Sequence, residues 1–281
     1  MDILVLYHAN CTDGFGAAFA AWKSLGTDGV KYIPVNYGEP PPDVTGKQVY
    51  ILDFSYPKAV LEEMAAKSDG IIMLDHHKTA FEDLGFADKD EVTFASGKLN
   101  VCLDRNRSGA MLTWLHFHGA PVPELIELID DYDRWQFNLL STKPVNKGLW
   151  ALAPWDFPQW NSLDISAVEE YGAILLRDHD AKVQQLAKEA SDCLIFTQAG
   201  LAVNAPSFFA SDLGHALATS CKTYGLVWSL LGNGMVQCSL RSNGDYDVSA
   251  IAKRFGGGGH KNAAGMRVDM NSLIRFLCSN S

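Results

Sequence analysis

The sequence predicts a two-domain α/β protein whose first domain contains a mostly parallel sheet. In the first half, short apolar runs alternate with stretches of helical periodicity, which is typical of successive strand–helix–strand units. From about residue 199 the pattern changes, and strands interleaved with helices predict a second, smaller α/β domain. A chain of 281 residues with 47% apolar residues is long enough to build two such cores.

The expected elements of the first half follow one another as strand and helix. Pro57 suits the first turn of its helix, and Ser108 is expected to cap the N-terminus of another. Small side chains in the first helix favour close packing against the sheet. The strands are expected at 3–7, 30–35, 49–54 and 71–74, and the helices at 14–25, 57–67, 108–118 and 123–131.

A long helix at about 167–190 is predicted to connect the two domains. Beyond it, strands are expected at 226–231 and 235–240, and helices at 211–221 and 248–255. We therefore predict a first domain at 1–165, a connector at 166–195 and a second domain at 196–281.

Charge and composition limit the classes of function. A formal net charge of −10 argues against general binding to long nucleic acids, which requires an excess of Lys and Arg. No apolar stretch approaches the length of a membrane span, and the N-terminus lacks the basic region of a signal peptide. The six cysteines form no C-x-x-C pair, which argues against a disulfide framework or a zinc knuckle and favours the reducing cytoplasm.

Three predicted strands end in side chains that can bind a metal ion. The first ends at His8, with Asp13 soon after, the third runs into Asp53, and the fourth into Asp75-His76-His77. The carboxyl ends of parallel strands meet at one edge of a sheet, where ligands bind. A helix end adds Asp130, Asp131 and Asp133, whose charges oppose the helix dipole and call for a nearby cation. The set predicts a site for two divalent ions bridged by Asp53.

The second predicted domain carries a glycine run that can wrap an anion. Residues 256–265 read Gly-Gly-Gly-Gly-His-Lys-Asn-Ala-Ala-Gly, and the glycines leave backbone N–H groups accessible. Arg241 is a candidate phosphate clamp. Arg105, Asn106 and Arg107 are lesser candidates for phosphate contact.

Four aromatic residues leave two interpretations open. They could stack a nucleobase or form an apolar patch between the domains, and we favour the patch. The residues are Trp150, Trp155, Phe157 and Trp160.

The order of these motifs resembles that of the DHH phosphoesterase superfamily with its C-terminal DHH-associated domain. The motifs are His8 with Asp13-Gly14, then Asp53, then Asp75-His76-His77, and finally Gly-Gly-Gly-Gly-His-Lys-Asn-Ala-Ala-Gly at 256–265. The resemblance covers essentially the whole chain. It implies a metal-dependent phosphoesterase with Mn²⁺ as the expected cofactor, Mg²⁺ or Co²⁺ as alternatives, and one or two ions bound. It also implies that the first domain is catalytic, that the second binds substrate, and that the active site lies in the cleft between them.

The resemblance also implies roles for individual residues. The metal ligands would be His8, Asp13, Asp53, His76 and Asp131. Asp75 would orient a ligand, and His77 would donate to the scissile phosphate. The substrate-binding residues would be Arg241, Gly257, Gly258, Gly259, His260 and Asn262.

Two positions depart from the family pattern. Asn10 stands where an Asp is expected in the first motif, which is one residue longer here, and Asn is a weaker ligand for a hard cation. In the fourth motif, three aspartates compete for one role, and we choose Asp131 with Asp133 as its close competitor.

The main hypothesis is a cytoplasmic phosphodiesterase that hydrolyses dinucleotides, linearised cyclic dinucleotides or short oligonucleotides to mononucleotides. The rivals are an exopolyphosphatase or 3′-phosphoadenosine phosphate phosphatase, and an inactive nucleotide-binding module in which Asn10 marks a lost metal. A short nucleotide or other small phosphate substrate is the only partner expected, without membrane or long nucleic acid. The oligomeric state, a homodimer included, is left open.

Overall fold

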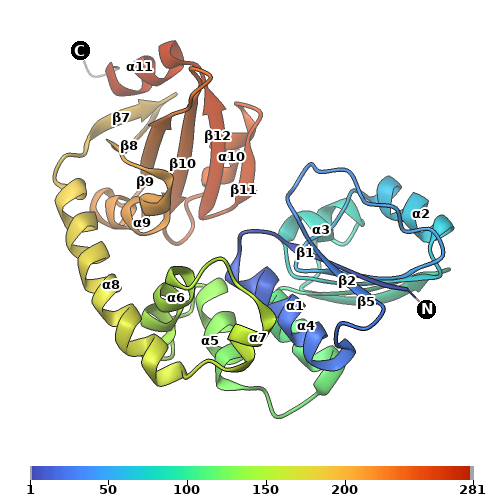
Figure 1. Cartoon of the computed structure of the whole chain (residues 1–281). Coiled ribbons are helices and arrows are strands. Elements are labelled where there is room, and N and C mark those ends of the chain that lie inside the picture. Colours follow the sequence, from blue (N-terminus) through green and yellow to red (C-terminus); the bar gives the residue numbers. More distant parts are fainter. Residues whose placement is uncertain (1, 279–281) are drawn as a thin grey trace. The chain divides into compact units, whose positions relative to one another are not determined.

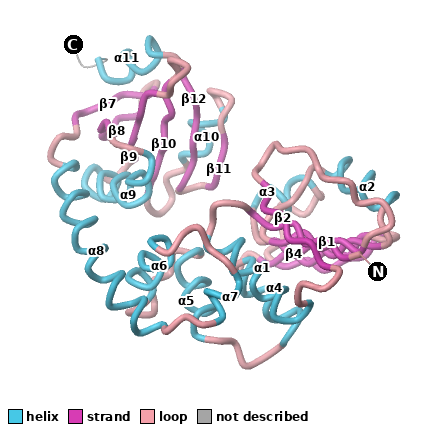
Figure 2. Tube along the Cα trace, viewed as in Figure 1, coloured by secondary structure: helices cyan, strands magenta, loops and turns pink. Residues whose placement is uncertain are grey.

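The chain folds into two compact units in a computed structural model, which describes residues 2–278. Unit 1 extends to Leu176 and unit 2 begins at Arg177, within helix α8 (Ile165–Ala187). Figures 1 and 2 show a separate sheet in each unit. Across the described part of the chain, every helix is too short or too polar to cross a membrane.

The sheet of unit 1 has six strands in the order β2-β1-β3-β4-β6-β5, and only β5 runs antiparallel to its neighbour. The predicted mostly parallel α/β fold is therefore confirmed. The strands are β1 (Ile3–His8), β2 (Val30–Val35), β3 (Gln48–Leu52), β4 (Gly70–Asp75), β5 (Glu91–Ser96) and β6 (Leu99–Asp104).

Helices cover both faces of this sheet because alternate strand residues point to opposite sides. Leu4 and Leu6 pack in a cluster that includes residues of α2 (Lys58–Lys67) and α3 (Lys78–Asp83). Val5 faces the other side, in a cluster with residues of α1 (Thr12–Leu25) and α4 (Gly109–His118). Burial on both faces explains why the central strands read as continuous apolar runs.

The rest of unit 1 is helical. Its core gathers around Phe15, Ile129 and Trp160 and joins α1 to the helices that follow the sheet. These helices are α5 (Glu124–Asp133), α6 (Thr142–Ala151), α7 (Phe157–Asn161) and the first part of α8.

Unit 2 contains a six-stranded sheet in the order β11-β12-β10-β9-β8-β7, in which only β8 and β9 pair in parallel. One face packs against α9 (Ala210–Cys221), which follows the short turn η1 (Ser207–Phe209), and the other packs against α10 (Val248–Lys253) and α11 (Met270–Cys278). The strands are β7 (Ser191–Ile195), β8 (Gln198–Asn204), β9 (Tyr224–Leu230), β10 (Val236–Ser242), β11 (Gly258–His260) and β12 (Ala263–Val268).

Several elements were not predicted. Strands β5 and β6 form a hairpin at the edge of the first sheet, and β7 and β8 begin the second sheet inside or just after the expected connector. Helix α5 ends at Asp133, two residues beyond the predicted end. That extension changes which aspartate reaches the site.

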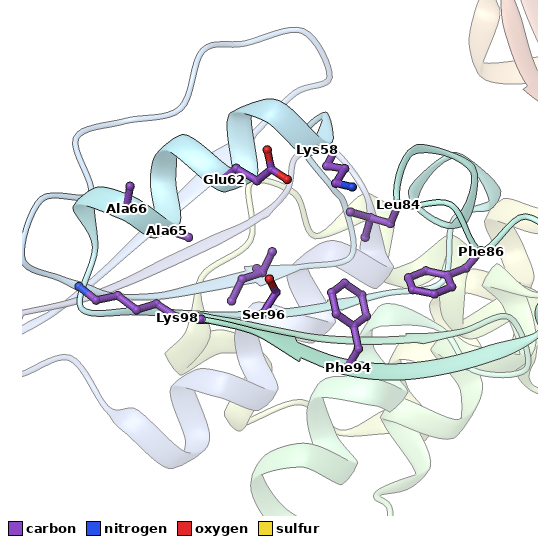
Figure 3. A pocket seen from close by; sticks show the side chains of 11 residues that line it. Lys58, Glu62, Ala65, Ala66, Leu84, Phe86, Phe94, Ser96 and Lys98 are labelled. Carbon is purple, nitrogen blue, oxygen red and sulfur yellow. The ribbon is translucent and has the colours of Figure 1, made fainter.

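A cavity of about 600 Å³ lies beside α2 and the β5–β6 hairpin (Figure 3). Its walls combine apolar side chains such as Leu84, Phe86 and Phe94 with the charged Lys58 and Glu62. None of the predicted site residues lines it. The predicted chemistry is therefore located elsewhere in unit 1.

Candidate metal centre

The register of the parallel strands brings the predicted strand-end residues side by side. Tyr7 pairs with Leu52, and Leu52 pairs with Leu74, so the residues that follow them emerge from adjacent strands. The backbone amide of Asp53 donates to the Leu74 carbonyl at 2.9 Å. Strand β1 lies between β2 and β3, where the strand order reverses, and such a switch point is where α/β sheets bind ligands.

Asp53 lies at the centre of the cluster. Its side chain is 1% exposed, with Oδ2 at 3.4 Å from His8 Nδ1 and Oδ1 at 3.1 Å from His76 Nε2. Its φ of +63° is left-handed, a conformation that non-glycine residues seldom adopt and that is concentrated at functional sites. Gly109 permits this arrangement, because a Cβ at that position would lie 2.4 Å from the Asp53 Cβ.

Asp13 is held by the N-terminus of α4. Its two carboxylate oxygens accept hydrogen bonds from the backbone amides of Gly109 at 2.7 Å and Ala110 at 2.8 Å. Oδ2 also lies 3.6 Å from His76 Nε2. The free amides and the dipole of a helix N-terminus favour a carboxylate there.

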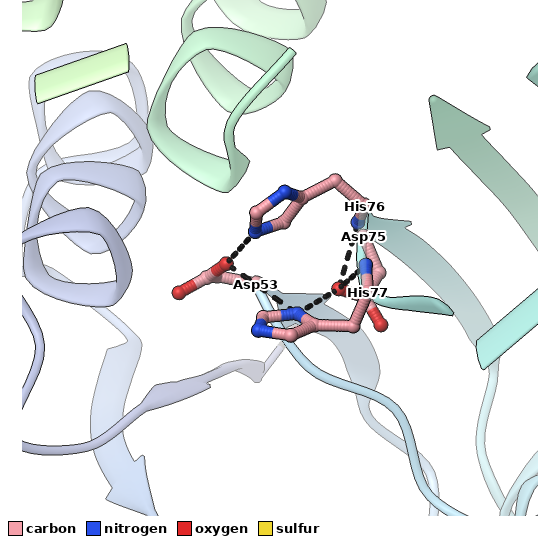
Figure 4. Close-up of side chains that lie close together, drawn as sticks. All are labelled: Asp53, Asp75, His76 and His77. Carbon is pink, nitrogen blue, oxygen red and sulfur yellow. Dashed lines mark hydrogen bonds and ion pairs between the residues drawn. The ribbon is translucent and has the colours of Figure 1, made fainter. Parts of the chain in front are cut away.

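The Asp75-His76-His77 segment leaves β4 with its first residue acting as a brace (Figure 4). Asp75 is fully buried, and its Oδ1 accepts the backbone amides of His76 at 2.8 Å and His77 at 3.2 Å. The same oxygen lies 2.8 Å from His77 Nδ1. Asp75 thus orients both histidines, the arrangement by which a carboxylate commonly fixes an imidazole.

The structure brings Asp133, and not Asp131, to the cluster. Asp133 Oδ2 lies 3.4 Å from His76 Nε2. The Asp131 carboxylate instead accepts hydrogen bonds from the amides of Asn138 and Leu139 and from the Thr142 hydroxyl, so it caps the following loop. The choice of Asp131 is corrected, because two further helical residues turn Asp133 toward His76.

The neighbouring charges raise the pKa of some groups of the cluster and lower the pKa of others. Burial and the neighbouring Asp53 and Asp133 raise the pKa of Asp13 well above its usual value. Burial opposes ionisation of Asp53, but close contacts with His76 and His8 outweigh it and lower the Asp53 pKa. For His76, burial is outweighed by Asp133, Asp53 and Asp13, which raise its pKa well above 6.5. A cation would remove this conflict among neighbouring carboxylates.

Unsatisfied polar atoms show that these residues fit a divalent cation. Both Asp53 oxygens, His8 Nδ1 and His76 Nε2 are buried and make no hydrogen bond to any residue from 2 to 278. Buried polar atoms are normally paired, and carboxylate and imidazole are ligands for Mn²⁺, Zn²⁺ and similar ions. Three groups place one ligand atom per residue within 4.8 Å of one another: Asp53, Asp75, His76 and His77; His8, Cys11 and Asp53; and Asp13, His76 and Asp133.

Cys11 is the residue that sequence reasoning missed. Asn10, which was considered as the substituted ligand, is exposed, and its amide donates to the Asn36 side chain at 3.2 Å. Asn10 has a φ of +54°, and the chain then presents Cys11 to the His8–Asp53 pair. The chain reads Cys11-Thr12-Asp13-Gly14 where the family motif ends in Asp-x-Asp-Gly. Aligning the two motifs on Asp13-Gly14 places Cys11, and not Asn10, at the position of the first Asp.

Tyr37 is a second unpredicted neighbour of the cluster. Its ring centroid lies 5.1 Å from that of His8 and 6.1 Å from that of His77, and 54% of the residue is exposed. The side chain therefore lies at the border between the cluster and solvent.

In unit 2 the predicted phosphate clamp is well anchored. Arg241 lies on β10, and its guanidinium donates to the Leu240 carbonyl at 2.9 Å and the Ser211 hydroxyl at 3.0 Å. Burial lowers its pKa from the ordinary arginine value. Arg241 pairs with Ala263 of β12, which is the neighbour of the glycine-rich β11.

The glycine run is a strand more than a loop. Gly258, Gly259 and His260 form β11 and pair with β12, while a Cβ on Gly257 would lie 2.2 Å from the Gly265 carbonyl oxygen. The Asn262 amide donates to Ser242 Oγ at 3.0 Å and to the Gly244 carbonyl at 3.1 Å, so it braces the loop after β10.

Two of the lesser candidates for phosphate contact, Arg105 and Arg107, contact other side chains of unit 1. Arg105 stacks over the Phe81 ring and Arg107 pairs with Asp104. The aromatic group packs within unit 1, where Phe157 stacks on Phe15 and Trp160 is 2% exposed. Phe157 and Trp160 were expected in an apolar patch between the domains, but they pack in the helical core of unit 1.

Comparisons with known proteins identify one domain of the chain and several similar proteins. Residues 201–278 match the DHHA1 domain. The chain is 32% identical to an uncharacterized protein, R106, of Acanthamoeba polyphaga mimivirus, over 94% of this chain and 66% of that protein. It is 25% identical to the oligoribonuclease NrnB of Bacillus subtilis, over 94% of this chain and 72% of that one.

Two solved structures share the fold. A pGpG-specific phosphodiesterase, PggH, from Vibrio cholerae matches with a TM-score of 0.53 and 13% identity, over 98% of this chain and 96% of that one. The exonuclease RecJ bound to manganese matches with a TM-score of 0.54 and 15% identity, over 99% of this chain and 89% of that one.

The DHHA1 match, the similarity to NrnB and the fold shared with PggH and RecJ all indicate the DHH phosphoesterase superfamily. Its relatives include hydrolases that act on phosphoester bonds.

Proposed function

We propose that the chain is a metal-dependent phosphodiesterase that hydrolyses dinucleotides and short oligonucleotides, linearised cyclic dinucleotides included, to mononucleotides. The observation that supports it most directly is the gathering of His8, Asp13, Asp53, His76 and Asp133 around buried atoms that lack hydrogen bonds among residues 2–278. An oligoribonuclease and a pGpG-specific phosphodiesterase among the similar proteins support the same class of substrate.

Mn²⁺ is the proposed cofactor, in keeping with RecJ bound to manganese. His8 and Asp53 would hold one ion, and Asp13, Asp53, His76 and Asp133 would hold another. When bound, divalent cations supply Lewis acidity that activates a water and neutralises charge on the phosphoryl oxygens.

The chain's own groups prepare the site for substrate. The α4 amides hold Asp13 in place, and Asp75 holds His77 through Nδ1. Burial opposes protonation of His77, but Asp75 and Asp53 raise its pKa above 6.5. Asp75 and Asp53 thus favour the protonated form of His77, which can donate a proton or hydrogen bond to a phosphate oxygen.

Arg241, the Gly257–Gly259 segment and His260 of unit 2 are proposed as substrate-binding residues. The Arg241 guanidinium is held by the Ser211 hydroxyl, and its two cross-strand partners, Gly225 and Ala263, are small. The acidic net charge favours short substrates over long polymers, and we place the protein in the cytoplasm.

Substitution of the central carboxylate and its histidine tests this function. Asp53→Asn and His76→Ala should each lower the rate of Mn²⁺-dependent mononucleotide release from pGpG by about 100-fold or more, because both remove groups at the reacting centre. Asp88→Asn, whose side chain is 80% exposed, is the control and should keep full activity. Undiminished turnover in both site variants would contradict the proposal.

A substrate panel separates the rival activities. The panel contains pGpG, long RNA, inorganic polyphosphate and 3′-phosphoadenosine phosphate. Release of free phosphate from the last two, without mononucleotide from pGpG, would favour the phosphatase. Nucleotide binding without metal-stimulated hydrolysis of any compound would favour the inactive module.

A further inference from the structure

Cys11 lies beside the Nδ1 atom of His8 and the carboxylate of Asp53, which are 3.4 Å apart and are both buried. Its Sγ, a nitrogen of His8 and a carboxylate oxygen of Asp53 all lie within 4.8 Å of one another. Asp53 is 1% exposed, and neither of its oxygens, nor His8 Nδ1, forms a hydrogen bond within residues 2–278. An imidazole, a thiol and a buried carboxylate that converge in this way are a ligand set for a transition metal.

The backbone explains why the thiol points to this pair. Asn10 takes a left-handed φ of +54° and directs its side chain to Asn36, so the extra residue of the motif is absorbed before Cys11. Cys11 is the N-cap of α1, but its side chain makes no capping hydrogen bond to that helix.

The two halves of the centre differ in chemistry. The group of Asp13, His76 and Asp133 offers two carboxylates and one imidazole, a set suited to Mn²⁺ or Mg²⁺. The group of His8, Cys11 and Asp53 replaces one oxygen donor by sulfur, a soft ligand that Mg²⁺ does not favour.

We propose that Cys11 is a thiolate ligand in the half of the centre formed with His8 and Asp53, and that it makes this half select Zn²⁺, Co²⁺ or Fe²⁺ over Mg²⁺. Binding forms the metal–sulfur bond, and the thiol proton is released to solvent. The proposal rests on the proposed function for the presence of a metal centre, but it concerns which cation the chain binds.

Cobalt spectroscopy tests the ligand directly. Titration of the metal-free full chain with Co²⁺ should produce a near-ultraviolet thiolate-to-cobalt charge-transfer band. Cys11→Ser should abolish the band, and Cys102→Ser should retain it, since Cys102 lies on β6 outside all three ligand groups. Cys11→Asp should abolish the band and shift the Zn²⁺-to-Mn²⁺ affinity ratio toward Mn²⁺ by about tenfold or more, as expected when sulfur is exchanged for oxygen.

A measurement on the unaltered chain tests the Cys11 ligand without relying on the folding of a variant. X-ray absorption of the Zn²⁺-loaded protein should show a sulfur scatterer at about 2.3 Å. A band that persists in Cys11→Ser, no band in the unaltered chain, or a zinc shell without sulfur would each overturn the proposal. These readouts do not depend on turnover. A protein that binds Co²⁺ with the band but hydrolyses no phosphoester would refute the proposed function and leave this assignment standing.

Discussion

At the scale of single residues, Asp53 combines strain, burial and unsatisfied oxygens. A left-handed non-glycine residue costs of the order of 1–3 kcal/mol and persists only where its surroundings impose it. Here the backbone hydrogen bond to Leu74 and the close approach of Gly109 impose it. The result is a carboxylate whose two oxygens face two different imidazoles, the position required of a bridging ligand.

Asp131 and Asp133 are two residues apart and should respond to substitution in opposite ways. Asp133→Asn should lower activity and Mn²⁺ affinity by about 10- to 100-fold with little change in stability, because it removes a charged partner of His76. Asp131→Asn should leave Mn²⁺ affinity unchanged and lower the free energy of unfolding by about 1–3 kcal/mol, because it weakens the bonds to Asn138, Leu139 and Thr142.

Calorimetric metal titration and thermal unfolding of both variants measure the two effects. Each variant serves as the control for the other. Loss of metal affinity in Asp131→Asn alone would restore the original assignment of that residue.

At the scale of secondary-structure elements, the N-terminus of α4 organises the centre. Ser108 caps the helix by accepting from the Met111 amide, and the Ser108 amide donates to Asp130. The next two amides bind Asp13, so this helix end holds carboxylates from both α1 and α5. Three segments distant in the chain are thereby joined at one point.

Gly109→Ala tests this contact. A methyl group there would overlap Asp53, so either α4 or Asp53 must move. We expect a fall in Mn²⁺ affinity of about tenfold or more and a loss of about 1–3 kcal/mol of stability from overpacking. Gly232→Ala is a matched control, since nothing lies within 4 Å of a Cβ at that position.

Metal titration and chemical denaturation give the two quantities. Unchanged affinity in Gly109→Ala would show that Asp53 tolerates displacement, and the role given to this helix end would then be wrong.

At the scale of the whole molecule, the centre is a source of instability when no cation is bound. The raised pKa of Asp13 means that the folded state holds a proton that the unfolded state releases above about pH 4. The raised pKa of His76 means that its favourable contribution is complete below about pH 6.5 and is lost as the pH rises through its folded value. Both effects make the free energy of unfolding fall with rising pH.

Chelator-treated protein should therefore lose stability from about pH 5 toward alkaline pH. Mn²⁺ at 100 times its Kd should raise the free energy of unfolding by about 2.7 kcal/mol and flatten this dependence. Urea unfolding at several pH values, with chelator or with Mn²⁺, measures both. The same slope with and without Mn²⁺ would mean that the cation binds away from Asp13 and His76.

Much of the centre was predictable because strand ends are marked in sequence by an apolar run that stops at a polar residue. His8, Asp53 and the Asp75-His76-His77 segment were located in this way, and β1, β3 and β4 bring them together. The end of α5 was not predictable to within two residues, because helix propensity weakens at termini and tertiary contacts decide where the last turn stops. For that reason Asp131 was expected in the cluster, whereas Asp133 lies there.

By itself, the sequence determined the alternation of strands and helices, and hence the α/β class and the edge at which polar residues gather, since these depend on local periodicity. Only the tertiary structure decided which side chains face one another. The left-handed backbone at Asn10 and Asp53, the approach of Gly109 and the turning of Cys11 toward His8 depend on contacts between distant segments. The hydrogen bond from the Ala110 amide to Asp13, for example, joins residues 97 positions apart. Local periodicity contains no information on such contacts, because packing between distant elements sets them.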